Sequence, residues 1–316
     1  MKAENILFEE ALNLTDKSWE ELSSISNSLR EKYKDSLVFT CAIINAKSGA
    51  CSEDCAFCAQ SIHHKTNIKI YPLISTEEIL KKAEQMKKSG ATRFSIVTSG
   101  KKTNKRELER ISETIYQIKE KVGISTCASL GILNEESARI LKEGGLERYH
   151  HNLETSRSFF PNICTTHSYE EDINTLKIAK QVGLKVCSGG IIGLGEKWKH
   201  RIELAFTLKE LNVDSIPINF LNPILGTRLQ NMPLLSPYEA LKAIAIFRII
   251  NPEKDITICG GRERVLEELQ DKVFNVGANG IMIGNYLTTK GRSIKEDMEM
   301  IRRYGLRLED GNERDA

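Results

Sequence analysis

Short apolar runs alternate with amphipathic segments along most of this chain. Eight runs are rich in the β-branched and apolar residues typical of strands, and they begin at Leu37, Arg93, Ile124, Arg148, Lys185, Ser215, Ile256 and Gly280. Between them lie segments whose apolar residues recur at helical spacing. Eight strand–helix units predict an α/β protein with a parallel (β/α)8 barrel of the TIM type, although a doubly wound sheet shares the same local pattern.

The helical segments carry recognisable start and stop signals. In the segment 75–90, Ser75 and Glu78 have the spacing of a capping box, and Gly90 ends the pattern. Segments that begin at Asn134, Ser168 and Ser236 repeat this design. A further helical stretch over about residues 4–34 precedes the first strand.

The organisation along the chain favours a single domain over residues 1–316. No Pro- or Ser-rich linker and no low-complexity tract divides the sequence. Within the domain we expect an N-terminal helical extension (1–36), a barrel core (37–290) and a C-terminal helix and tail (291–316).

Composition and charge exclude several function classes. The 316 residues are 40% hydrophobic and 28% charged, with a formal net charge of +2, so nothing indicates a nucleic-acid surface or a polybasic membrane anchor. Acidic residues occupy the N-terminus where a secretory signal needs an apolar core, and no apolar run approaches the roughly 20 residues that span a bilayer. We therefore expect a cytoplasmic protein whose eight cysteines are ligands or core residues.

Three cysteines follow the first predicted strand. Cys51, Cys55 and Cys58 lie in SGACSEDCAFCAQS, and their spacing lacks the separated pairs of zinc fingers. Three thiolates on a 4Fe-4S cluster leave one iron without a protein ligand, and that iron can chelate a small molecule. A zinc site completed by a distant residue is the alternative. In a barrel, this first loop lies at the C-terminal face, where barrel enzymes carry out their chemistry.

These motifs resemble those of the radical S-adenosylmethionine enzymes. C-x3-C-x-aromatic-C, with Phe57 at the aromatic position, is the signature of that superfamily, and GGIIGLGE (189–196) fits its G-x-I-x-G-x-x-E strand, which backs the adenine. The resemblance implies that the open iron binds S-adenosylmethionine and that an electron cleaves it to methionine and a deoxyadenosyl radical. It makes Phe57, Gly190 and Ile191 candidate cofactor-binding residues.

Five segments narrow the resemblance to the biotin synthase family. SGACSEDCAFCAQS, YHHNLETS, KVCSGGIIGLGE, IPINFLNPILGT and GGRE occur in that family's order over nearly the whole chain. The related hydrogenase-maturation and pyrrolysine-pathway enzymes share the barrel and the first motif but not this set. The resemblance implies a sulfurtransferase that inserts sulfur from an auxiliary iron–sulfur cluster into dethiobiotin. It also implies reduced ferredoxin or flavodoxin as electron donor, iron–sulfur assembly machinery as a partner, and a homodimer.

The same resemblance assigns roles to polar residues at the strand ends. Asn152 and Glu154, the latter where the family usually has Asp, are expected to contact the ribose of S-adenosylmethionine. Asn219 and His150 are expected at the ureido ring of dethiobiotin. The substrate carboxylate is expected to meet a pair of residues after the eighth strand, Thr288 and Thr289. A core imidazole and a threonine helix cap are the alternative readings.

The auxiliary cluster departs from the family pattern. The family holds a 2Fe-2S cluster with three cysteines and an arginine, of which Cys127, Cys187 and Arg262 are recognisable here. The third cysteine position is Ser95, whose oxygen is a poorer ligand than a thiolate for a sulfide-rich iron centre.

Two additional cysteines offer a replacement ligand set. Cys41 and Cys259 belong to the first and seventh strands, Cys127 and Cys187 to the third and fifth. Because each interior layer of such a barrel takes side chains from alternate strands, the four thiols are predicted to surround the axis. We expect a four-iron auxiliary cluster on these thiolates, with 2Fe-2S the less favoured type and Arg262 beside it as a partner or ligand. Buried core cysteines are the alternative.

Two further positions and two further functions complete the predictions. Asp172 stands where the family has an arginine for the S-adenosylmethionine carboxylate, so a cation from elsewhere or other contacts must serve. Cys164 lies in a polar loop, and no role is expected for it. The alternative functions are another radical enzyme of the same barrel, such as a maturase or mutase, and a non-enzymatic iron–sulfur assembly or storage protein.

Overall fold

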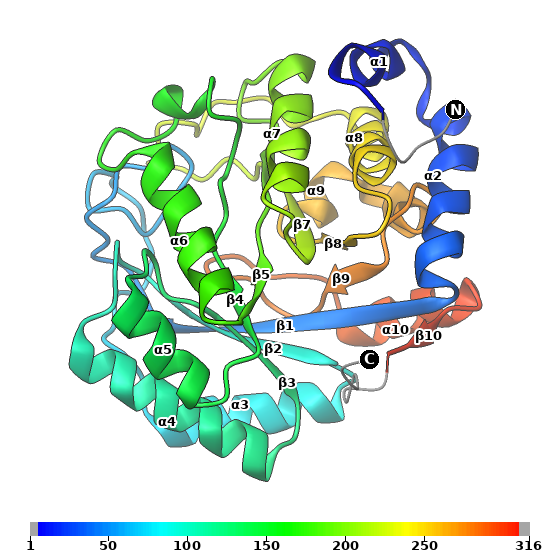
Figure 1. The fold of residues 1–316 in the computed structure, drawn as a ribbon. Helices are drawn as coiled ribbons and strands as arrows, with labels where there is room; N and C mark the ends of the chain where they lie inside the picture. The colour runs from blue at the N-terminus through cyan, green and yellow to red at the C-terminus, as the bar shows by residue number, and fades with distance from the viewer. Residues whose placement is uncertain (1–5, 310–316) are drawn as a thin grey trace.

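Parallel strands close into a barrel with helices around it (Figure 1). The structure is a computed structural model that describes residues 6–309. The barrel strands are β1 (Leu37–Lys47), β2 (Arg93–Thr98), β3 (Ser125–Ser129), β4 (Arg148–His150), β5 (Lys185–Cys187) with β6 (Gly190–Ile192), β7 (Ser215–Phe220), β8 (Asp255–Ile258) and β9 (Gly280–Met282). Each pairs in parallel with the next, and β1 pairs with β9. The predicted (β/α)8 barrel is confirmed, and the doubly wound sheet is excluded.

The fifth barrel position is interrupted between β5 and β6. Both segments pair with β7, which runs past the break. A side chain at Gly189 would meet the carbonyl of Pro217, and one at Gly190 would meet the carbonyl of Glu154, so only glycine permits this close backbone approach. The sequence pattern had predicted one unbroken strand here.

The barrel is covered by helices that follow the strands. They are α3 (Thr76–Lys88), α4 (Lys105–Lys121), α5 (Glu135–Glu143), α6 (Tyr169–Gln181), α7 (Trp198–Glu210), α8 (Pro237–Ile250), α9 (Arg262–Val265) and α10 (Ile294–Arg303). The predicted capping box at the start of α3 is confirmed, because Ser75 accepts a hydrogen bond from the backbone of Glu78 and Glu78 reaches back to Ser75. No helix within residues 6–309 has the length and apolar character to cross a membrane.

The N-terminal helical stretch is divided rather than continuous. Helix α1 (Phe8–Asn13) is followed by a 3-10 turn (Leu14–Asp16) and then by α2 (Trp19–Lys34), which packs against α8. The division follows from Ser18, which forms a capping box with Glu21 and so starts a new helix. Residues 4 and 5 of the predicted stretch lie outside the described residues. A short strand, β10 (Arg307–Leu308), pairs with the start of β1.

Alternate strand residues point into the barrel, and this alternation creates the site. On β2, Phe94 and Ile96 are buried outside the cavity, whereas Arg93, Ser95 and Val97 line it. Most barrels of this type fill their interior with branched aliphatic side chains. Here many inward positions hold cysteine, serine, histidine or asparagine, and a cavity of 320 Å³ remains.

Candidate active site

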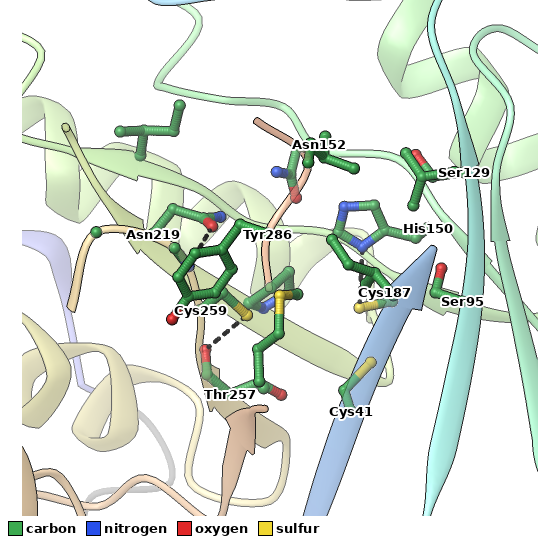
Figure 2. Close-up of a pocket in the computed structure, with 18 of the residues that line it drawn as sticks. Cys41, Ser95, Ser129, His150, Asn152, Cys187, Asn219, Thr257, Cys259 and Tyr286 are labelled. Atoms are coloured by element: carbon green, nitrogen blue, oxygen red, sulfur yellow. Dashed lines mark hydrogen bonds between the residues drawn. The ribbon is translucent and has the colours of Figure 1, made fainter. Parts of the chain in front are cut away.

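The cavity runs along the barrel interior from the three-cysteine loop to a second group of thiols, three of which, Cys41, Cys187 and Cys259, are labelled in Figure 2. Cys58 and Phe57 of the first loop line it at the C-terminal ends of the strands. Cys41, Cys127, Cys187 and Cys259 line it from within the barrel. Polar side chains from the strands and their loops also face this space, and they include Ser129, His150, Asn152, Asn219, Thr257 and Tyr286.

Backbone hydrogen bonds fold the three-cysteine loop after β1. The amide of Cys51 donates to the carbonyl of Gln60 at 3.0 Å, and the amide of Cys58 donates to the carbonyl of Cys55 at 2.9 Å. Burial raises the pKa of the Cys58 thiol to about 11, and the pKa of the Cys55 thiol is raised by its hydrogen bond with Cys164 and by burial. Iron binding would therefore have to displace protons from these thiols. Three thiols gathered on one loop at the cavity mouth fit a cluster with one open iron.

Behind this loop lies a thiol that the sequence analysis had set aside. The Sγ atom of Cys164 is buried 3.9 Å from the Sγ atom of Cys55 and 3.2 Å from Nδ1 of His167. The hydrogen bond from Cys55, and then that from His167, lower the pKa of Cys164 to about 4. The expectation that Cys164 lies in a polar loop without a role missed these contacts. The contact with Cys55 joins residues 109 positions apart, so no local pattern reveals it.

His167 and Asp172 form the centre of a buried charged network. Nδ1 of His167 lies 2.6 Å from Oε2 of Glu53, and its Nε2 lies 3.3 Å from Oδ2 of Asp172. The other oxygen of Asp172 meets Nε2 of His151 at 2.7 Å. Although burial acts to lower it, the pKa of His167 is raised to about 11 because Asp172 and the Cys164 thiolate stabilise the imidazolium. Asp172 is thus ion-paired with His167, but Glu53 and the Cys164 thiolate add two further negative charges, because the pKa of each is lowered. Which group replaces the family's arginine stays a prediction.

The residues predicted for the S-adenosylmethionine ribose stand together above β4. Asn152 donates to a carboxyl oxygen of Glu154 at 3.3 Å and accepts from the amide of Gly189 at 3.1 Å. Glu154 has a φ of 61°, in the left-handed region that a non-glycine residue rarely adopts, and its backbone bridges to Gly190. Asn152, Glu154 and Ile191 line the cavity. The backbone of Gly190 fixes the position of Glu154 through this bridge.

Glu154 gives the unliganded protein a specific pH dependence. Burial, with the charge of Asp172, raises its pKa to about 8. Between pH about 4.5 and about 8, the Glu154 carboxyl is protonated in the folded protein and ionised in the unfolded chain. The free energy of unfolding therefore falls as pH rises through this window. We expect Glu154→Gln to remove this loss, which is at most about 4 kcal/mol. Urea unfolding of the cluster-free wild type and variant at pH 5 and pH 8 measures it. An equal change in stability with pH for both proteins would contradict this prediction.

The residues predicted for the ureido ring of the substrate come from β4 and β7. Asn219 on β7 accepts from the amide of Gly260 at 3.0 Å and donates to the carbonyl of Gly190 over a long 3.4 Å. His150 on β4 has Nδ1 3.3 Å from Sγ of Cys187, and burial lowers its pKa to about 4, so its ring is neutral. Figure 2 shows Asn219 and His150 reaching toward one space from different strands.

The loop after β9 borders the same cavity. Thr288 and Thr289 line it, and the amide of Tyr286 donates to the carbonyl of Thr289 at 3.0 Å, which closes a turn. Tyr286 itself faces the cavity and bonds through its hydroxyl to Glu263. The sequence analysis did not single out Tyr286, because a tyrosine after a strand carries no distinctive signal.

The four inner cysteines share one enclosed volume. They come from β1, β3, β5 and the residue after β8, the first, third, fifth and seventh barrel positions. Burial raises the pKa of each thiol, that of Cys41 to about 12, and the charge of neighbouring cysteines raises it further for Cys41, Cys187 and Cys259. Thiols that are close enough to repel one another when ionised, in a cavity of this size, fit a polynuclear iron–sulfur cluster.

Arg262 lies outside the cavity lining, although its charge acts to lower the pKa of Cys259. It is buried and does not line the cavity, and its guanidinium pairs with Asp297 at 2.6 Å and with Gln270 at 2.9 Å. Ser95 does line the cavity, and its hydroxyl acts to lower the pKa of Cys127 through a hydrogen bond. Which side chains contact an auxiliary cluster stays a prediction.

Comparison with known proteins places this arrangement in a family. The Radical SAM superfamily profile matches residues 46–208, and that of the Biotin and Thiamin Synthesis associated domain matches residues 217–307. A biotin synthase of Geotalea daltonii is 52% identical over 96% of this chain and 93% of its own. A biotin synthase of Syntrophus aciditrophicus is also 52% identical, over 93% of this chain and 91% of its own. The chain belongs to the biotin synthase family.

Solved structures support the fold of this biotin synthase family member at lower identity. Methylornithine synthase is similar with a TM-score of 0.84 and 20% identity, over 97% of this chain and 95% of that one. The FeFe-hydrogenase maturase HydG from Carboxydothermus hydrogenoformans has a TM-score of 0.83 and 17% identity, over 97% and 76%. These likenesses concern the barrel alone. The family relationship makes the chain a radical S-adenosylmethionine enzyme, and non-enzymatic storage is excluded.

Proposed function

We propose that this enzyme forms biotin by inserting sulfur into dethiobiotin, with two iron–sulfur clusters at opposite ends of one cavity. The observation that carries the proposal is the continuity of the lining from Cys58 at the mouth to the four inner cysteines. When bound, the cluster at the mouth supplies the electron that cleaves S-adenosylmethionine, and the inner cluster supplies the sulfur. The protein has to place the substrate carbons between them.

The mouth residues hold the nucleoside. The aromatic ring of Phe57 and the side chain of Ile191 give the lining an apolar surface for adenine. Asn152 and Glu154, already hydrogen-bonded to each other, present polar atoms to the ribose hydroxyls. A protonated Glu154 donates to one hydroxyl, whereas an ionised one accepts. His167 lies behind the three-cysteine loop, where Glu53 and Asp172 hold its ring in place.

Asn219 orients the substrate through its amide. A ureido ring offers both N–H donors and a carbonyl acceptor, and one carboxamide can satisfy both. The long bond to Gly190 leaves the Asn219 amide group available to a ligand. His150 is neutral and presents one donor and one acceptor atom. Thr288 and Thr289, which line the cavity after β9, offer hydroxyls to the substrate carboxylate.

Replacing Asn219 by alanine is expected to weaken dethiobiotin binding by about 10-fold, since one or two neutral hydrogen bonds are lost. Steady-state kinetics would show a raised KM for dethiobiotin, with S-adenosylmethionine cleavage continuing in the absence of substrate. Asn219→Asp is the matched control, because it keeps an acceptor at nearly the same size but loses the donor. An unchanged KM in both variants would remove Asn219 from the substrate site.

The auxiliary centre is proposed to be a four-iron cluster on Cys41, Cys127, Cys187 and Cys259. Four thiols in one volume are the donor set that such a cluster takes. Ser95, at the position of the missing family cysteine, is then a hydrogen-bonding neighbour. Arg262 is proposed to act from behind by positioning the loop after β8, where Cys259 lies, through its ion pair with Asp297.

Product analysis separates this function from its nearest alternative. The anaerobically reduced enzyme, incubated with S-adenosylmethionine and dethiobiotin, is expected to yield biotin together with methionine and deoxyadenosine. Methionine and deoxyadenosine without biotin would favour a radical maturase or mutase on the same barrel. Reduced ferredoxin or flavodoxin is the proposed donor of electrons, iron–sulfur assembly proteins are proposed to restore the clusters, and a homodimer is the proposed assembly.

A further inference from the structure

The inner end of the cavity contains two arginines in addition to its cysteines. Arg93 on β2 and Arg148 on β4 both line the cavity and are 5% and 6% exposed. Arg148 lies in direct register with Cys127 of the neighbouring strand, and Arg93 lies in register with Cys41. Each positive charge acts to lower the pKa of Cys41 and Cys127, so both guanidinium groups are electrostatically close to these thiols.

The charge of Arg93 is already matched by acids. One guanidinium nitrogen of Arg93 lies 2.9 Å from Asp255 and another lies 3.0 Å from Glu309. Its guanidinium carbon also lies 3.6 Å from the centre of the Phe39 ring. Two carboxylates and an aromatic face therefore account for Arg93 without any bound group.

Arg148 differs in having no such partner. Its Nε atom is buried without a hydrogen-bond partner in the described part of the chain, and no ion pair joins Arg148 to a carboxylate of residues 6–309. A buried cation without a partner is costly. Arg148 lines the same cavity as the four inner cysteines and lies in register with Cys127. The negative charge that this guanidinium lacks is the charge that ionised thiols would bring.

We propose that Arg148 is the positioning residue that balances the charge of the auxiliary cluster, a role that rests on the proposed function of the four inner thiolates. Four thiolates around an iron–sulfur core leave it with net negative charge in a cavity of low polarity, and reduction adds more. A fixed guanidinium beside Cys127 stabilises the ionised ligands and favours the reduced cluster. The charge of Arg262, like that of Arg93, is already matched by an acid, Asp297.

Substitution of Arg148 gives the test a readout other than activity. In the full chain carrying Cys51→Ala, Cys55→Ala and Cys58→Ala, so that only the auxiliary cluster remains, the reduction potential is followed by an EPR-monitored titration. Arg148→Met is expected to shift this potential to more negative values and to reduce iron retention, and Arg148→Lys is expected to restore both in part. Arg106→Met, which removes the same charge from the exposed face of α4, is the matched control and should change neither.

This experiment distinguishes failure of the role of Arg148 from failure of the proposed four-thiol cluster. An unchanged potential and unchanged iron content in Arg148→Met would overturn the role of Arg148 while leaving the four-thiol cluster intact. If Arg148→Met fails to fold, Arg148→Gln decides, because it keeps a polar side chain and removes only the charge. The proposal predicts a more negative potential in the folded glutamine variant, and a wild-type potential would overturn it. Failure of the ligand set would instead appear as an auxiliary cluster that survives loss of Cys41 and Cys259.

Discussion

Replacing Cys58 by alanine is expected to reduce S-adenosylmethionine cleavage to background. Cys58 is the member of the three-cysteine loop that lines the cavity, so its loss removes both a cluster ligand and the link between the cluster and the substrate space. The measurement is deoxyadenosine formation after anaerobic reconstitution and reduction. Iron content should fall in parallel, since a cluster held by two thiolates is poorly retained.

Cys164 provides the control for this first prediction. It is a thiol 3.9 Å from Cys55, yet it does not line the cavity. Cys164→Ser is expected to retain iron and S-adenosylmethionine cleavage. If it instead abolished metal binding as completely as Cys58→Ala, a fourth protein donor would close the site, and the zinc alternative would replace the open-iron account.

The second large effect concerns the double variant Cys41→Ala, Cys259→Ala. It is expected to lose the auxiliary cluster, so that iron falls from about eight to about four per chain. S-adenosylmethionine cleavage should continue, because the three-cysteine loop is untouched, while biotin formation should stop. Iron and sulfide analysis, paired with a deoxyadenosine assay, measures both parts.

Ser95→Ala is the matched control for the double variant. Ser95 lies on β2 within the same lining, at the position where the family has its third cysteine. Because a serine oxygen is a poor ligand for such a centre, its removal should leave about eight irons per chain. Retention of the auxiliary cluster in the double variant, together with its loss in Ser95→Ala, would restore the family's older ligand pattern.

The barrel could be predicted because its signal is local. Each strand can be predicted from its own residues, and capping residues such as Ser75 and Asn134 mark where helices begin. The same alternation that identifies β2 and β3 as strands also shows that Ser95 and Cys127 face one side. The sequence was therefore sufficient to expect four cysteines around one axis, and the structure brings them to one cavity.

The charged network behind the loop could not be predicted in this way. Glu53, Cys164 and His167 meet across more than a hundred residues of chain, and Asp172 completes the contact from α6. From the sequence alone, Asp172 only marks the loss of the family's arginine. In the fold it is an ion-pair partner of His167, whose pKa is raised to about 11. Only tertiary contacts reveal this pairing.

The surroundings of Arg148 inside the barrel could not be predicted from the sequence either. Its position at the start of a strand was plain from sequence, and its inward direction follows from the alternation with Tyr149. The absence of a partner for its Nε, in contrast to the two acids that face Arg93, depends on side chains from distant strands and the C-terminal segment.

The most direct test of the whole account follows the sulfur atom. The enzyme is reconstituted with isotopically labelled sulfide, freed of unbound sulfide, reduced, and given dethiobiotin and S-adenosylmethionine for a single turnover. The account predicts biotin that carries the label in its ring, and no labelled biotin from the double variant lacking Cys41 and Cys259. Labelled biotin from that variant, or biotin without label from the intact enzyme, would contradict the claim that the four inner thiolates hold the sulfur donor.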